Sequence, residues 1–324
     1  MLGGCSSVSQ GNIVVVIVGP TASGKSKLAI DICKELNGEV VSADSMQIYR
    51  RMDIGTAKAS KEEQDGIPHH LIDILEPNEE YSLDRFLSDC QNAVDDILSR
   101  GKLPVIAGGT GLYISTFVNN IELSEAKVDE EYRSVLERIA DTYGNLTLKQ
   151  LLFDIDKDSY NRLNINDRKR LIRALEVYRA IGSSITKANS ISEKKGKYNF
   201  VIYGLNFKDR NLLYERINNR VDDMVKNGLL DEARWLFGQE LSNTALQAIG
   251  YKELFDYFEG KKSLDSAIDF LKQASRNYAK RQITWFKKDE NISWYHLDEK
   301  KYEEILKLTV NSIVKIANVC YNKE

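Results

Sequence analysis

The segment Gly19–Ser26 constrains the fold of this chain more than any other, because it matches the pattern G-x-x-x-x-G-K-[ST]. It follows the unbroken β-branched run Ile13–Val18 and leads into an amphipathic segment that ends near Leu36. An apolar run of this kind is typical of a strand buried on both faces of a parallel sheet. A strand, a glycine-rich turn and a helix in this order predict a phosphate-binding loop.

The residue types of this loop suit an anion and a metal ion. Backbone N–H groups of such a loop and of the following helix N-terminus converge on anionic oxygens. The Lys25 ammonium adds a positive charge beside the phosphates, and the Ser26 hydroxyl is a ligand for Mg²⁺. We therefore predict Mg²⁺ as the cofactor and a di- or triphosphate as the ligand, with ATP left open. The predicted binding residues are Gly19, Pro20, Thr21, Ala22, Ser23, Gly24, Lys25 and Ser26.

Short apolar strands alternate with amphipathic helices over much of the chain. Beyond the first strand, strands are expected at Glu39–Ser42, Pro68–Ile72, Pro104–Ala107, Phe200–Leu205 and Ile292–Tyr295. Helices are expected from about 26 to 36, at 81–98, 209–227, 231–237, 251–258 and 264–288, and from 302 onward. The stretch 119–196 shows helical spacing only. This alternation predicts a doubly wound parallel sheet.

The simplest organisation is an α/β fold in which a helical insertion domain interrupts a P-loop NTPase-like parallel sheet core. The length of 324 residues supports two units, because single hydrophobic cores usually stop growing at smaller sizes. We expect the core to comprise residues 13–118 and 199–324 and the insertion residues 119–198. Residues 1–12 carry no motif and are expected to be a disordered N-terminal extension.

The composition excludes several classes of protein. Hydrophobic residues make up 42% and charged residues 29%, which is ordinary for a globular protein and too apolar for a disordered one. No apolar run approaches the ~18 residues of a membrane span. The four cysteines lack the C-x-x-C spacing of a zinc site. We therefore expect a cytoplasmic monomer with reduced thiols and no membrane partner.

The distribution of charge is more informative than the net charge of −3. Between Lys272 and Lys288 there are six basic residues and no acidic one, and between Lys157 and Arg179 seven basic residues face three acidic ones. A single run of this kind is usually a solvated helix face. Two basic stretches in an acidic protein favour a polyanionic partner.

Two polar residues follow neighbouring strands of the predicted sheet. Asp44 comes directly after the strand that ends at Ser42, and Thr110 lies in the glycine-rich turn after Ala107. Because the carboxyl ends of parallel strands open into one crevice, both residues are expected near the phosphate-binding loop. Asp44 is either a helix cap or a general base or outer-shell partner of Mg²⁺. Thr110 either donates to a leaving phosphate oxygen or caps the next helix.

Taken together and in this order, the motifs resemble the tRNA dimethylallyltransferase (tRNA isopentenyltransferase) family of the bacterial type. The matching segments are GPTASGKS (19–26), ADSMQIYR (43–50), DIGTAKA (53–59), GIPHHLID (66–73), IAGGTGLY (106–113), NDRKRLIRALEVYR (166–179), QAIGYKE (247–253) and RNYAKRQITWF (276–286). The resemblance covers nearly the whole chain from about residue 13 to 300. The segment 145–164 fits the family pattern only loosely, and the Cys/His zinc finger of eukaryotic relatives is absent.

The resemblance implies transfer of a dimethylallyl group from dimethylallyl diphosphate to N6 of the adenosine at tRNA position 37, giving N6-(dimethylallyl)adenosine and diphosphate. Asp44 would accept the proton from N6, and Thr110, Lys25 and Ser26 with Mg²⁺ would stabilise the leaving diphosphate. Arg220 matches a family arginine beside the donor phosphates, although a surface salt bridge is an alternative. An acidic residue is missing from the strand Val105–Ala107, which agrees with a loop that does not cleave ATP.

The resemblance also implies contacts with the tRNA anticodon stem-loop. The residues that match the family's tRNA contacts are Asp44, Ser45, Met46, Gln47, Thr110, Arg133, Lys169, Arg170, Leu171, Ile172, Arg173, Gln247, Ala248, Ile249, Gly250, Tyr251 and Lys252. For Trp285, core packing and contact with substrate are equally open.

Three alternative functions remain open from the residues alone. The first is a P-loop kinase, which the missing carboxylate on the fourth strand and the basic helical insertion disfavour. The second is an adenylate isopentenyltransferase, which would share the core but would not need a basic insertion of this size. The third is an RNA-binding module with an inactive loop, which the intact Lys25, Ser26, Asp44 and Thr110 disfavour.

Overall fold

The computed structural model describes residues 12–121, 129–182, 184 and 196–321. The chain divides into two compact units, one formed by 1–115 with 197–324 and the other by 116–196. The sequence placed the two junctions at 118/119 and 198/199. The predicted disordered extension 1–12 lies outside the described residues, apart from Asn12.

The first unit is built on a six-stranded sheet with the order β3-β2-β4-β1-β5-β6, in which every neighbouring pair is parallel. The strands are β1 (Ile13–Val18), β2 (Gly38–Ser42), β3 (His69–His70), β4 (Leu103–Gly108), β5 (Asn199–Asn206) and β6 (Ser293–His296). This topology confirms the predicted α/β fold class with a parallel sheet. It also places the segments that follow β1, β2 and β4 side by side.

One predicted strand is much shorter than expected. The segment Pro68–Ile72 was predicted as a strand, but only His69 and His70 pair with β2. Pro68 has no N–H to donate to a ladder, and Leu71 adopts a φ of 60°, which turns the chain out of the extended conformation. The apolar pattern of the sequence did not reveal that the strand begins only after Pro68 and ends before Leu71.

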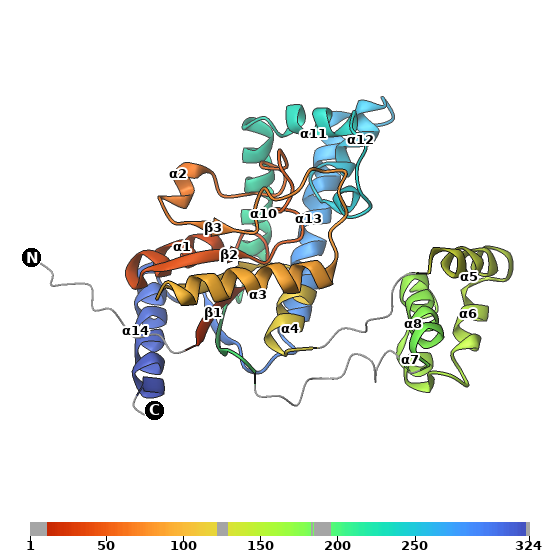
Figure 1. Ribbon diagram of the computed structural model, residues 1–324. Coiled ribbons are helices and arrows are strands. Elements are labelled where there is room, and N and C mark those ends of the chain that lie inside the picture. Colours follow the sequence, from red (N-terminus) through yellow and green to blue (C-terminus); the bar gives the residue numbers. More distant parts are fainter. Residues whose placement is uncertain (1–11, 122–128, 183, 185–195, 322–324) are drawn as a thin grey trace, which may run out of the picture. The chain divides into compact units, whose positions relative to one another are not determined.

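The helices of the first unit connect these strands or extend beyond the sheet. They are α1 (Lys25–Leu36), α2 (Lys61–Gln64), α3 (Leu83–Ser99), α4 (Gly111–Val118), α10 (Arg210–Lys226), α11 (Leu229–Phe237), α12 (Lys252–Phe258), α13 (Leu264–Phe286) and α14 (Tyr302–Tyr321), with a 3₁₀ turn at Ala245–Gln247. The long helix α13 runs beside α10 (Figure 1). No helix in the described ranges combines the length and the apolar character that a bilayer span requires.

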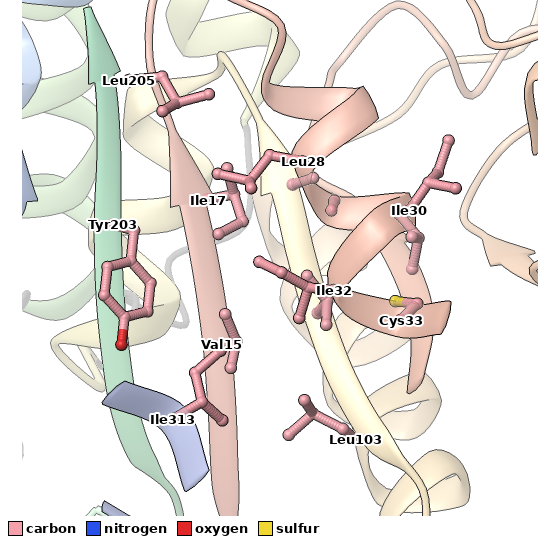
Figure 2. Close-up of a cluster of buried hydrophobic side chains, with 14 of the residues drawn as sticks. Val15, Ile17, Leu28, Ile30, Ile32, Cys33, Leu103, Tyr203, Leu205 and Ile313 are labelled. Carbon is pink, nitrogen blue, oxygen red and sulfur yellow. The ribbon is translucent and has the colours of Figure 1, made fainter. Parts of the chain in front are cut away.

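The core that holds the phosphate-binding loop in place lies between α1, α14 and the sheet. Figure 2 shows Leu28 and Ile32 of α1 facing the strands that carry Ile17 and Leu103. Ile313 of α14 belongs to the same buried cluster. Because α1 is packed along its length, its N-terminus and the preceding loop are fixed against the carboxyl end of β1.

The second unit has a hydrophobic core of its own. Its helices are α5 (Glu130–Tyr143), α6 (Asn145–Leu151), α7 (Lys157–Arg162) and α8 (Arg168–Ile181). Leu136, Leu148 and Leu175 lie in one buried cluster that these helices share. The Asp167 side chain, at the start of α8, accepts no cap hydrogen bond and instead pairs with Arg170 at 3.2 Å.

Candidate active site

A cavity of about 1050 Å³ lies in the first unit, where the segments after β1 and β2 meet α10 and α13. Residues of the phosphate-binding loop and of the segment after β2 line it, together with the loop that precedes α12. The sequence predicted that these motifs converge, and the cavity is where they do. All residues that line it belong to the first unit.

The conformation of the phosphate-binding loop suits an anion. Ala22 and Gly24 both adopt left-handed conformations, with φ of 62° and 82°. A Cβ on Gly19 would lie 2.5 Å from the carbonyl oxygen of Leu205, so only glycine fits there. Gly24 precedes α1 without a side-chain cap, which leaves the first N–H groups of that helix for a ligand.

Lys25 is the cation of this loop. Its Nζ lies 3.5 Å from the Pro20 carbonyl oxygen, and no carboxylate within the described residues is at ion-pair distance. Burial lowers the pKa of Lys25 from 10.5 to about 8, an effect that Asp44 opposes and Arg220 reinforces. A bound anion would replace the missing counter-charge and raise this pKa again.

The ends of β2 and β4 are held together closely. The Ala43 N–H donates to the Ala107 carbonyl at 2.9 Å, and the Thr110 N–H donates to the Ala43 carbonyl at 3.3 Å. A Cβ on Gly108 would lie 2.2 Å from the Ala43 oxygen, so a larger residue would force the strands apart. Asp44 and Thr110 are thereby brought close to each other, as the sequence predicted.

Asp44 and Thr110 organise the segment after β2. The Thr110 hydroxyl oxygen accepts from the Ser45 N–H at 3.1 Å and donates to the Ser45 hydroxyl at 3.3 Å. Asp44 Oδ1 accepts from the Met46 N–H at 3.0 Å, and the residues that follow form a turn. Asp44 therefore caps no helix, and it lines the cavity. The alternative of a helix cap, left open by the sequence, does not hold.

Two side chains of α13 complete the site, although neither was among the predicted site residues. Gln282 is only 4% exposed; its Oε1 accepts from the Thr21 N–H at 2.8 Å and its Nε2 donates to the Gly109 carbonyl at 3.0 Å. It thus ties the phosphate-binding loop to the turn after β4. Tyr278, one turn earlier, lies close to Thr110 and Asp44, and burial raises the pKa of its hydroxyl. Tyr278 is therefore a neutral donor at physiological pH.

Arg220 of α10 lines the cavity and donates to the Ala57 carbonyl at 3.5 Å. Within the part of the chain that the structure describes, it forms no salt bridge with a carboxylate, so the alternative of a surface pair is wrong. Gln47 also reaches this segment: its Nε2 donates to the Thr56 and Ala57 carbonyls, both at 3.4 Å, and its Oε1 accepts from the Ser42 hydroxyl.

The loop 247–252 forms another part of the cavity wall. Gln247, Ile249, Gly250 and Lys252 line the cavity, whereas the Ala248 and Tyr251 side chains are buried behind it. Gly250 has a φ of 117°, and a Cβ on it would lie 3.1 Å from the Gly55 backbone. Glycine is therefore required where this loop crosses the segment 53–57.

Glu232 of α11 joins these two segments and was missed in the sequence. Its carboxylate accepts from three consecutive N–H groups, those of Asp53 and Ile54 at 3.0 Å and of Gly55 at 2.9 Å. It also accepts from the Tyr251 hydroxyl at 2.8 Å. A glutamate in the first turn of a helix resembles any solvent-exposed residue, so the sequence contains no signal for this contact.

The predicted RNA-binding residues of the second unit divide into two groups. Lys169 and Arg170 are exposed on α8. Arg133 makes two hydrogen bonds with the buried carboxylate of Glu176, at 2.8 and 2.9 Å, and Arg173 lies 3.7 Å from the same group.

Leu171 and Ile172 were predicted to contact tRNA, but both are buried in the core of the second unit. Burial on the inner face of α8 leaves their side chains no access to RNA, so this part of the prediction is wrong. The match to the family's motif covered a continuous stretch of helix, in which only some residues face outward.

The cavity also suits a magnesium ion. Ser26 lines it, as do Lys25 and Asp44. In the described residues no group of three or more His, Cys, Asp or Glu is arranged to hold a metal. Mg²⁺ usually keeps several waters and binds through one or two protein groups plus phosphate oxygens, so the Ser26 hydroxyl would be the protein ligand of an ion bound beside phosphates.

A phosphate-binding loop that faces a carboxylate in one cavity of a parallel α/β sheet defines a group-transfer enzyme with an anionic leaving group. Comparison with known families identifies which one. The family model described as IPP transferase matches residues 47–289, and the one described as isopentenyl transferase matches residues 12–73. The chain belongs to the IPP transferase family, a family of prenyltransferases, which confirms the resemblance read from its motifs.

Two tRNA dimethylallyltransferases are similar in sequence to this protein over nearly its whole length. A tRNA dimethylallyltransferase of Caldanaerobacter subterraneus subsp. tengcongensis is 48% identical over 297 residues, which cover 90% of this chain and 94% of the relative. One of Acetivibrio thermocellus is 48% identical over 289 residues, covering 88% and 92%.

Solved structures show the same fold. The full-length tRNA isopentenylpyrophosphate transferase of Bacillus halodurans is 41% identical with a TM-score of 0.72, and the match covers 96% of this chain and 99% of that one. A eukaryotic dimethylallyltransferase captured acting on tRNA is 29% identical with a TM-score of 0.78, covering 94% and 80%.

Proposed function

We propose that this protein transfers a dimethylallyl group from dimethylallyl diphosphate to N6 of the adenosine at tRNA position 37 and releases diphosphate. The observation that carries the proposal is one cavity lined by both Lys25 of the phosphate-binding loop and Asp44 of the segment that follows β2. Relatives with 48% identity bear the name tRNA dimethylallyltransferase.

The donor diphosphate binds at the N-terminus of α1. The N–H groups of the loop, the Lys25 ammonium and the Arg220 guanidinium supply positive charge on that side of the cavity. Ser26 would hold Mg²⁺, which when bound neutralises charge on the diphosphate as it leaves. The protein therefore stabilises the leaving group rather than activating a γ-phosphate.

Asp44 serves as the general base. The amine of adenine is a weak nucleophile, because its lone pair is delocalised into the ring. As the bond from N6 to the allylic carbon forms, the bond from that carbon to the diphosphate oxygen breaks and Asp44 takes the N6 proton. Productive transfer requires the amine to be held in line at about 3–3.5 Å from the carbon.

Thr110, Ser45 and Tyr278 position this base and the adenine. The hydrogen bonds between Thr110 and Ser45 fix the segment that carries Asp44. Tyr278 lies beside Thr110 and Asp44, so its neutral hydroxyl is placed to donate toward the substrate. Met46 and Gln47 line the same cavity, in which the target base would be enclosed.

The RNA partner is the anticodon stem-loop. Loop bases are unpaired, so the target base can leave its stack at small cost to enter an enclosed site. The cavity is lined by Gln247, Ile249, Gly250 and Lys252, and this supports a contact of these residues with the base and its neighbours. The exposed Lys169 and Arg170 supply phosphate contacts from the second unit, and Arg133 and Arg173 add positive charge around Glu176.

Mass spectrometry of the RNA tests this proposal against its nearest rival. The purified protein is mixed with dimethylallyl diphosphate, Mg²⁺, an anticodon stem-loop and free AMP in one reaction. We expect the stem-loop to gain a single C5 unit while AMP stays unmodified. Prenylated AMP with an unmodified stem-loop would identify an adenylate isopentenyltransferase instead.

A further inference from the structure

A second cavity of the first unit is much smaller than the active-site cavity, with a volume of about 20 Å³. The residues that line it include Ser26 near the start of α1, Ser42 at the end of β2 and His69 of β3. A cavity needs roughly 10–15 Å³ and two to four polar partners to hold one water molecule. This small cavity therefore suits a single water. Ser26 lines both cavities, so it lies between the two.

His69 brings a hydrogen-bond acceptor to the small cavity. Its Nδ1 lies 2.8 Å from the Ile67 carbonyl oxygen, and because a carbonyl can only accept, Nδ1 carries the proton. Burial lowers the pKa of His69, so the ring is neutral at physiological pH and its Nε2 is an acceptor. Among the residues that the structure describes, no group donates to this nitrogen.

The other polar groups around the small cavity are largely occupied. Lys58 Nζ donates to one carbonyl and two carboxylates, at 2.5 to 2.7 Å, which uses all three of its protons. Gln47 Nε2 donates to two carbonyls, and Gln47 Oε1 accepts from the Ser42 hydroxyl at 3.1 Å. What remains for a water is two acceptors, His69 Nε2 and Ser42 Oγ, and one donor, the Ser26 hydroxyl.

A serine hydroxyl that ligates Mg²⁺ needs an acceptor for its own proton. A lone pair of its oxygen faces the ion, so the O–H must donate in another direction. In P-loop enzymes that cleave ATP, a carboxylate also holds the metal beside this hydroxyl. Here β4 contributes Ala107 to the wall of the small cavity, and Ala107 has no polar side chain. The unused nitrogen acceptor at this wall is that of His69.

We propose that His69 is a positioning residue for the Mg²⁺ ligand Ser26 and acts through one water molecule held in the small cavity. The Ser26 hydroxyl donates to the water oxygen, and the water donates to His69 Nε2 and to Ser42 Oγ. The lone pairs of the Ser26 oxygen are then directed to the metal. This inference rests on the proposed function, because it requires Mg²⁺ beside the donor diphosphate. Hydrogen-bond partners of a metal ligand raise metal affinity by fixing the orientation of that ligand.

Calorimetric titration with an unreactive thiolo analogue of the donor, at several Mg²⁺ concentrations, measures the contribution of His69. His69→Phe keeps a ring of similar size but removes the acceptor, whereas His69→Gln retains an acceptor on its amide. The Mg²⁺ concentration that gives half-maximal donor binding should rise about 10- to 100-fold in His69→Phe. In His69→Gln it should stay within about threefold of the unmodified protein.

Donor binding in the presence of EDTA separates positioning of the metal ligand from damage to the fold. Without Mg²⁺, the unmodified protein and His69→Phe should bind the analogue equally, because the phosphate-binding loop itself is unchanged. His296→Phe is the matched control, since His296 lies at the end of β6 and lines neither cavity. An unchanged Mg²⁺ requirement in His69→Phe, or an equal loss of affinity with and without Mg²⁺, would overturn the proposal.

A double variant tests whether His69 acts through Ser26. Ser26→Ala removes the metal ligand, so adding His69→Phe to it should raise the Mg²⁺ requirement little further. Additive effects of the two changes would contradict a shared path.

A high-resolution crystal structure of the unmodified protein tests the water itself. It should show one water in the small cavity, at hydrogen-bond distance from Ser26, Ser42 and His69. A dry cavity, or a Ser26 hydroxyl that donates to another side chain, would contradict the proposal.

The same titrations distinguish this inference from the proposed function. If the unmodified protein binds the analogue no better with Mg²⁺ than with EDTA, the metal site of the proposed function fails. If Mg²⁺ strengthens binding and His69→Phe behaves like the unmodified protein, only the role of His69 is wrong.

Discussion

Among single residues, Lys25 links the protonation state of the site to donor binding. Its pKa of about 8, below the ordinary 10.5, reflects burial of the ammonium, an effect that the charge of Arg220 reinforces. A bound diphosphate favours the charged form and so raises this pKa. Below pH 8 the ammonium is already present, whereas above pH 8 binding must also take up a proton.

Donor affinity should therefore fall as the pH rises above about 8, by at most about tenfold for each pH unit. Calorimetric titration with dimethylallyl diphosphate and saturating Mg²⁺ between about pH 7 and 9.5 measures this. The matched variant Lys25→Met should bind more weakly and lack this component of the pH dependence. If donor affinity changes with pH in the same way in the unmodified protein and in Lys25→Met, Lys25 does not titrate in this range.

Asp44 provides the second prediction at this scale. Asp44→Asn keeps the size and the hydrogen bond to the Met46 N–H but removes the basic oxygen. Single-turnover rates should fall by a factor of about 10²–10⁴, the usual contribution of a general base. RNA affinity should stay within about threefold, because the cavity keeps its shape. An unchanged rate would remove Asp44 from the role of base.

The residues found from the sequence differ physically from those that were missed. Lys25, Ser26 and Asp44 follow their strands directly, so local pattern and strand order suffice to place them. Gln282 bonds to Thr21 across 261 residues of chain, and no local pattern encodes such a pair. Gln282 and Tyr278 both lie in the family motif RNYAKRQITWF (276–286), which indicated the segment but not the contact.

At the scale of elements, α13 connects the phosphate-binding loop to the turn after β4 through the Gln282 side chain. Gln282→Leu would leave the Thr21 N–H and the Gly109 carbonyl without this partner. We expect a loss of about 1–3 kcal/mol of unfolding free energy, because buried polar groups would be left unsatisfied. Gln273→Leu, at an exposed position of the same helix, should be nearly neutral in the same urea titration. Equal stabilities would show that the bridge is unimportant.

Glu232 connects α11 to two loops of the site, just as Gln282 connects α13 to two others. Glu232→Gln removes the charge that three N–H groups and the Tyr251 hydroxyl share. The lost charge-assisted bonds are worth about 1.5–3 kcal/mol, so KM for RNA should rise about tenfold as the segment 53–57 loosens. Asp231→Asn, its exposed neighbour, is the control and should match the unmodified protein in steady-state kinetics. A KM for Glu232→Gln that equals the control's would contradict this role.

Most helices and strands were predicted from the sequence, whereas α2 was missed and β3 was predicted too long. Long helices such as α3 and α13 show a sustained apolar periodicity, and the sequence placed both within a few residues of their ends. The four-residue helix α2 was missed, because it is too short for periodicity and is fixed by the capping box of Ser60 and Glu63. The truncation of β3 came from backbone conformation rather than from side-chain pattern.

At the scale of the whole molecule, the two units carry different functional residues. The exposed basic residues of α8 belong to the second unit, whereas all residues that line the cavity belong to the first. The second unit has its own core, and its α8 exposes Lys169 and Arg170. The position of a contiguous basic stretch is readable from sequence. Which of its residues face outward depends on the core that the helices share, and this is why Leu171 and Ile172 were misassigned.

The double variant Lys169→Ala with Arg170→Ala should weaken RNA binding and make it less dependent on salt. Each lost phosphate contact lowers the slope of log affinity against log salt by roughly 0.7–0.9. Filter binding at several salt concentrations measures the slope, and the prenylation rate at saturating RNA should stay unchanged. Lys261→Ala, a lysine paired with Glu259 in the first unit, is the control. An unaltered slope would show that α8 does not face the phosphates.

A crystal structure of the protein with an anticodon stem-loop, Mg²⁺ and a thiolo analogue of the donor tests the central claim most directly. It should show the diphosphate on Gly19–Ser26 beside Lys25 and the adenine N6 at hydrogen-bond distance from Asp44, about 2.6–3.2 Å. A diphosphate bound on another surface, or a target base that remains stacked outside the cavity, would contradict the account.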